Sequence, residues 1–293
     1  MLPTSTASQP SVLPRPAAAL TAILIMLIVI AAASGLLFSD RIYQPDAVLR
    51  PQFRAQDTVM LAVAVPLLFL CMAGARRGSI AASIVWAGLL LHIAYFYYFY
   101  VGGVQFGPLF LVHIAIVSVS LFALLSLVLR TDADRVRRYC EPDLRPGVTA
   151  GFLLFVGLAF AGVWIADTIM RLRDGRSLDL VARAVYSADL IVILPAMVAT
   201  GVGLQRSRPW AFVWAGVLLT NLVAVMITLA VTGVFSRAAG QPVQSGEILP
   251  AAAVALAGLA VGRRFPFHVS MPLLRHRPTH AEMQQPAGRG GQQ

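Results

Sequence analysis

Long apolar runs are the feature that most constrains how this chain can fold. A helix needs about 20 mostly apolar residues to cross a hydrocarbon core of about 30 Å. Lipid offers the backbone no hydrogen-bond partner, so such runs are expected to form helices. The sequence therefore predicts an all-α, polytopic membrane helix bundle with about eight transmembrane helices. The runs cover residues 17–38, 57–74, 79–101, 108–129, 147–170, 187–204, 209–234 and 247–262.

The composition supports a membrane location and excludes several kinds of mechanism. Hydrophobic residues make up 58% of the chain and charged residues 12%, a balance that soluble globular domains do not approach. All 23 basic residues are arginine, which excludes lysine nucleophiles and a Walker A phosphate loop. Cys71 and Cys140 offer neither a disulfide framework nor a Cys-x-x-Cys pair. We find no catalytic motif, and we expect no cofactor and no metal site.

The arginines are distributed unequally between the two sides that alternating loops define. One set of loops and tails holds 15 arginines against five acidic residues, and the other holds eight against eight. Arginine is enriched in cytoplasmic loops, so the basic set, with both termini, is expected to be cytoplasmic in a bacterial-type inner membrane. Because the charge is scattered through short loops, we expect no binding of nucleic acid.

This topology divides the chain into two four-helix units with tails on the same side. A cleaved signal peptide is the alternative for the first run, since Ala31–Gly35 supply small residues for cleavage. Cleavage would leave seven spans and place the N-terminus outside. The expected divisions are a disordered tail over 1–16, units over 17–129 and 147–262 with a basic loop over 130–146 between them, and a basic, largely disordered tail over 263–293.

Similar segments recur in the two units. Val85–Gly88 reads Val-Trp-Ala-Gly, the same four residues recur at Val213–Gly216, and Pro66 in the second run recurs as Pro195 in the sixth. Four spans return the chain to its starting side, so the matches predict a 4+4 parallel internal duplication. Chance similarity between apolar helices is the alternative.

Polar residues inside the predicted spans are the candidates for a ligand site, because they are costly in lipid. His113 lies in the outer part of its span, whereas His92 and Asn221 lie deeper and at similar depths, and Tyr95 follows His92 on the same helix face. Together these four residues could line an outward-facing cavity. The competing interpretation of each histidine is a neutral imidazole in the core. Two histidines on different helices could also hold a metal or haem iron, but the membrane core lacks nearby carboxylates.

Two further groups of residues stand out near the span ends and centres. Pro66 and Pro195 lie inside spans, where each removes a backbone hydrogen bond and could act as a hinge, although proline is also common in ordinary spans. Acidic residues at outer span ends lie near arginines, and such outer-loop charges either order the loops into a cap or remain solvated. These charges are Asp57, Asp167 and Asp189, with Arg54, Arg171 and Arg183.

The sequence favours a multi-pass membrane protein that is transporter-like or binds a small ligand or lipid. An accessory or sensor subunit without a substrate of its own is one alternative. A membrane-embedded enzyme acting on lipids, with histidine as general base, is another. Expected partners are membrane lipids and a small apolar or amphipathic ligand. Anionic lipid headgroups are expected near Arg130, Arg135, Arg137 and Arg138.

Overall fold

The computed structural model describes residues 15–43, 49–103, 106–140, 145–240, 254 and 256–260. Within these ranges the chain is all-helical, and seven helices are long and apolar enough to cross a membrane. The predicted polytopic membrane helix bundle is confirmed. The spans are α1 (Arg15–Leu37), α3–η1–α4 (Arg50–Arg76), α5 (Ile80–Gly102), α6 (Phe110–Val128), α8 (Pro146–Arg173), α9–η2–α10 (Leu180–Gln205) and α11 (Pro209–Ala238).

Two spans begin earlier than their apolar runs. The run predicted over 57–74 starts at Arg50, and the run predicted over 187–204 starts at Leu180. In both, an amphipathic segment, α3 (Arg50–Val59) or α9 (Leu180–Ala188), precedes the apolar part. Average hydropathy misses such segments because polar residues on one face lower the mean of the whole segment. The eighth predicted run, 247–262, lies largely outside the described residues, as do most of both predicted tails.

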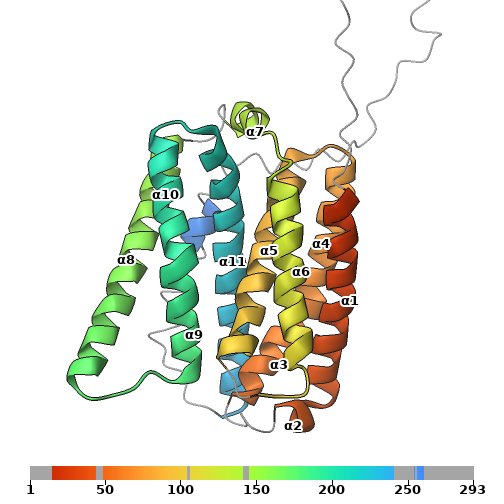
Figure 1. The fold of residues 1–293 in the computed structure, drawn as a ribbon, viewed down its shortest axis with the longest axis vertical. Coiled ribbons are helices and arrows are strands. Elements are labelled where there is room, and N and C mark those ends of the chain that lie inside the picture. The colour runs from red at the N-terminus through yellow and green to blue at the C-terminus, as the bar shows by residue number, and fades with distance from the viewer. Residues whose placement is uncertain are drawn as a thin grey trace, which may run out of the picture.

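Helix α5 lies at the centre of the described bundle and is the most buried of its spans. Ser79 caps its N-terminus by accepting a hydrogen bond from the Ala82 N–H at 3.2 Å. Helix α5 packs on α4, α6 and α11. Helices α8 and α10 lie side by side at one edge of the bundle, and α1 lies at the other (Figure 1). Gly88 allows the close approach of α5 and α11, because a Cβ there would overlap the side chain of Thr220.

A π-helical turn directly precedes each of the two predicted hinge prolines. The turns are η1 (Met60–Ala64) and η2 (Asp189–Ile193), and Pro66 and Pro195 are the second residues of α4 (Val65–Arg76) and α10 (Leu194–Gln205). A wider turn relieves the clash between a proline ring and the carbonyl one turn earlier. The likeness of the two turns agrees with the predicted duplication, which stays a prediction because most of its eighth helix, 247–262, lies outside the described residues.

The predicted basic loop over 130–146 contains a short helix, α7 (Ala133–Cys140). It crosses one end of the bundle, opposite the end that carries α2 (Ser39–Ile42) (Figure 1). Val136 and Cys140 face inward, and the Arg137 guanidinium donates a hydrogen bond to the Ser207 carbonyl at 3.2 Å. An amphipathic helix at this level is suited to the membrane interface.

Candidate functional site

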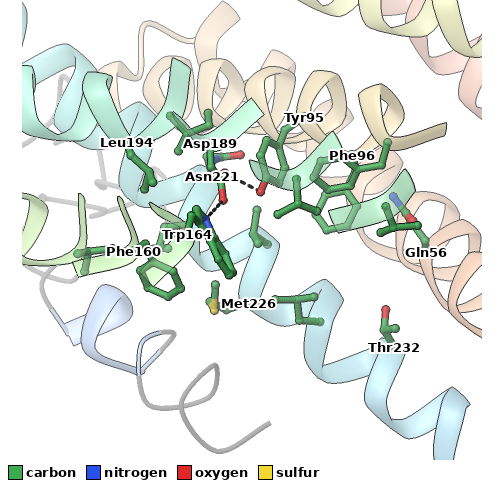
Figure 2. Close-up of a pocket in the computed structure, with 18 of the residues that line it drawn as sticks. Gln56, Tyr95, Phe96, Phe160, Trp164, Asp189, Leu194, Asn221, Met226 and Thr232 are labelled. Carbon is green, nitrogen blue, oxygen red and sulfur yellow. Dashed lines mark hydrogen bonds between the residues drawn. The ribbon is translucent and has the colours of Figure 1, made fainter. Parts of the chain in front are cut away.

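A cavity of about 320 Å³ lies between α3, α5, α8, α9–η2–α10 and α11 (Figure 2). Its walls are mainly apolar, and six of its lining side chains are aromatic: Phe53, Tyr95, Phe96, Phe99, Phe160 and Trp164. The polar residues that reach it are Gln52, Gln56, Asp189, Asn221 and Thr232. A concave, mostly apolar site with a few polar groups is the usual form of a small-molecule site.

Asp189 is the acidic group of this cavity. It is the first residue of η2 and is only 8% exposed. Its carboxylate accepts hydrogen bonds from the Tyr95 hydroxyl at 2.8 Å and the Trp164 indole N–H at 2.9 Å, as Figure 2 shows. Among the described residues it forms no ion pair. Within the described part of the chain, this buried carboxylate therefore has neutral donors and no counter-ion.

Trp164 is held in place by a second row of contacts on α8 and α9. Its ring stacks on Tyr186 with centroids 4.3 Å apart, and the Tyr186 hydroxyl donates to Asp167 at 2.8 Å. Asp167 also pairs with Arg171 at 2.7 Å, so this predicted charge pair forms. The pair acts at a distance from the cavity, by fixing the tyrosine that supports the indole.

Asn221 of α11 supplies an acceptor without a partner. It lines the cavity and is 2% exposed. Its side-chain oxygen has no hydrogen-bond partner among the described residues, and neither does the side-chain nitrogen of Gln56. A buried polar atom left unpaired costs about 1–3 kcal/mol. A ligand that donates a hydrogen bond to Asn221 would remove this cost.

Of the four residues predicted to share a cavity, Tyr95 and Asn221 line this one and the two histidines do not. His92 is 1% exposed, with Nε2 3.5 Å from the Thr228 hydroxyl and Nδ1 without a partner among the described residues. His113 packs on the rings of Tyr97 and Tyr100 instead, with centroids 5.7 and 4.7 Å away.

The two imidazoles are separated because His92 and the tyrosines that contact His113 lie on different faces of α5. His92 stacks edge-on against Phe96, one turn further along the same face, with centroids 4.8 Å apart. Tyr97 lies about 140° around the helix from His92 at 100° per residue. The expectation that one cavity joins His92 and His113 is therefore not met, whereas the expected burial of His92 is confirmed.

Two of the acidic residues predicted at outer span ends are buried in helices. Asp189 belongs to η2, as described above, and Asp57 belongs to α3, where it is 2% exposed. Their sequence neighbours Arg54 and Arg183 are exposed and pair with neither carboxylate in the described structure. A carboxylate and an arginine close in sequence need not meet, because burial selects one helix face for the acid.

The Tyr43 hydroxyl, between α2 and α3, donates to the buried Asp57 carboxylate at 2.6 Å. Burial raises the pKa of Tyr43, and the Asp57 carboxylate raises it further. Gly35 of α1 faces this pair, and a Cβ at Gly35 would overlap both the carboxylate and the hydroxyl. The Tyr43–Asp57 pair therefore depends on a glycine at that position.

His92→Gln is expected to lower the melting temperature. It is expected to change the affinity for a ligand of this aromatic cavity less than threefold. The imidazole fills core space between α5 and α11 but does not line the cavity. Thermal unfolding and ligand titration on the same purified variant would measure both effects. A large loss of affinity in a stable variant would assign His92 to the site and contradict this expectation.

Sequence reasoning did not group Trp164, Phe160 and Asp189 into one site, because they come from α8 and η2 and meet Tyr95 of α5 only in the fold. Comparison with known proteins adds no assignment: no family model, no curated protein and no solved structure matches the chain.

Proposed function

We propose that this multi-pass membrane protein is transporter-like and binds a small protonated amine with an apolar body. The observation that carries the proposal is Asp189, a buried carboxylate whose donors among the described residues are all neutral, in a cavity walled mainly by apolar and aromatic side chains. A charged group inside a membrane protein is costly unless it is paired, and such residues commonly mark substrate or ion pathways. An ammonium group supplies the missing partner.

The polar atoms favour an ammonium that carries N–H groups. Asp189 accepts hydrogen bonds, and the unpartnered oxygen of Asn221 is a second acceptor in the same cavity. Both atoms match a primary or secondary ammonium donor. Aromatic faces such as those of Phe96 and Phe160 attract a cation and cover its hydrocarbon body. A volume of about 320 Å³ is near the lower limit of ligand sites, which suits a small molecule.

The position of Asp189 supports a transport role. It lies nine residues from Leu180, so about 14 Å from the end of the span at 1.5 Å per residue. The loops at that end belong to the charge-balanced set, and the positive-inside rule favours an outward orientation for it. Because Asp189 is part of η2 and precedes Pro195, any rearrangement of this π turn moves the carboxylate.

The proposal is tested with matched pairs of small ligands on the purified wild-type protein. Primary amines with phenyl, cyclohexyl or butyl bodies are compared with alcohols of the same skeleton, and affinity is taken from thermal stabilisation. At least one amine is expected to bind ten times or more tightly than its alcohol, and its trimethylated form is expected to bind more weakly. Equal affinity within every pair would contradict recognition of the charge.

Transport is measured separately, as counterflow of the best radiolabelled amine in proteoliposomes. Accumulation above protein-free liposomes is expected. Saturable binding without counterflow would contradict the transport half of the proposal and leave a ligand-binding protein.

A further inference from the structure

We propose that a second cavity, at the end of the bundle that carries α7, binds a phosphate-bearing anion. The cavity has a volume of about 730 Å³ and lies between the start of α1, the α4–α5 turn, the end of α6 and α7. It is separate from the aromatic cavity and shares no lining residue with it. The inference therefore does not depend on the proposed amine site.

Three arginines give this cavity its chemistry: Arg15, Arg130 and Arg135. None forms an ion pair within the part of the chain that the structure describes. Asp132 is the acidic residue of the lining, and its carboxylate accepts the backbone N–H of Arg135 at 3.0 Å. The guanidinium groups are left for an external anion, and their planar geometry matches phosphate oxygens.

Hydroxyl groups also line this cavity, at the α4–α5 turn. Gly78 adopts a positive φ of 83° and lets the chain reverse there, which brings Ser79 and Ser83 to the cavity. The Ser79 oxygen accepts the Ala82 N–H, and its own hydrogen stays available to a ligand. A neutral donor of this kind complements arginine at anion sites.

Much of the remaining lining is apolar. It includes Ile80, Ile84 and Leu127, and also Val136 of α7, which is 2% exposed. Arg130 follows the last residue of α6 by two positions, so the charged groups lie at the end of a span. Charge next to hydrocarbon at that level fits a lipid phosphate with its glycerol and upper acyl chains. A free phosphate shares only the charged part of these contacts.

The test measures thermal stabilisation of delipidated protein by three probes at matched ionic strength: phosphatidylglycerol, phosphatidylcholine and inorganic phosphate. Phosphatidylglycerol is expected to stabilise the wild-type protein. The Arg130→Gln/Arg135→Gln variant is expected to need at least ten times more of it. Arg76→Gln/Arg77→Gln is the matched control, because these exposed arginines lie at the same end but outside the lining. In the control variant, the phosphatidylglycerol concentration that gives half of the maximal stabilisation is expected to change less than threefold.

The probes separate the two sources of the anion. Stabilisation by phosphatidylglycerol alone assigns a lipid, and equal stabilisation by inorganic phosphate assigns a soluble phosphate compound; both support the anion site. An equal loss in the control variant, or no stabilisation by any probe, would overturn the proposal. The melting temperature of the Arg130→Gln/Arg135→Gln variant is also measured without any probe, and a value equal to that of wild type shows that the variant is folded.

Discussion

Asp189→Asn is expected to weaken binding of the preferred amine at least a hundredfold. Asparagine keeps the size of the side chain and an oxygen that can still accept from Tyr95 or Trp164. The substitution removes the negative charge that the proposed ammonium would face in a mainly apolar cavity. A hundredfold loss corresponds to about 2.7 kcal/mol, within the range for losing one partner of a buried charge pair.

The measurement is a titration of the amine and of its alcohol into wild type and variant. The alcohol is expected to bind both proteins equally, because it makes no ionic contact. Asp174→Asn is the matched control: Asp174 is exposed, pairs with Arg176 and does not line the cavity. An Asp189→Asn protein that retains full amine affinity would remove the carboxylate from the site.

The membrane architecture could be predicted from the sequence because it depends on local composition. An apolar run such as 108–129 is long enough by itself to specify a span, and α6 differs from that run only at its ends. The early starts at Arg50 and Leu180 were missed because α3 and α9 are amphipathic. In these two helices the apolar face packs on protein. The mean hydropathy of a segment does not show that its apolar residues share one face.

The candidate site was only partly predictable, for a physical reason that Asp189 illustrates. Its donors Tyr95 and Trp164 lie 94 and 25 residues away in the chain, so the cluster exists only after three helices pack. Arg183 is nearer in sequence, but six residues turn a helix by about 600°, which puts it on a different face. Sequence proximity therefore suggested an ion pair, whereas helix periodicity prevents it.

Tyr95 and Asn221 were predictable as site residues because a polar residue in an apolar run is costly without a partner or a use. The same rule selected His92, which is buried but serves the α5–α11 contact through Thr228. The rule identifies residues that face protein, and it does not separate a cavity wall from a packed interface. That distinction needs the tertiary neighbours.

Gly35→Ala is expected to lower the free energy of unfolding by roughly 3 kcal/mol. The added methyl group would occupy space that the Asp57 carboxylate and the Tyr43 hydroxyl now fill. Overpacking in a core costs about 1–3 kcal/mol, and a buried carboxylate deprived of its hydrogen bond costs about 1–3 kcal/mol more. Thermal and denaturant-induced unfolding of the purified variant in detergent would measure the loss.

Gly151→Ala and Gly162→Ala are the matched controls in α8. A Cβ at either position meets no described atom within 4 Å. Because alanine favours a helix over glycine by about 1 kcal/mol, these variants are expected to be as stable as wild type or slightly more stable. A loss in the controls equal to that of Gly35→Ala would mean that the cost does not come from Asp57 and Tyr43.

A double-mutant cycle with Asp57→Ala assigns the cost to the pair. Asp57→Ala alone is expected to destabilise the protein, because it leaves a cavity and a buried Tyr43 hydroxyl without its acceptor. In Gly35→Ala/Asp57→Ala the new methyl group enters the space that the carboxylate has left. The loss of stability in this double variant is therefore expected to be smaller than the sum of the losses in the two single variants. Strict additivity would show that α1 shifts to accept the methyl group, and that the Tyr43–Asp57 hydrogen bond does not fix the position of α1 against α3.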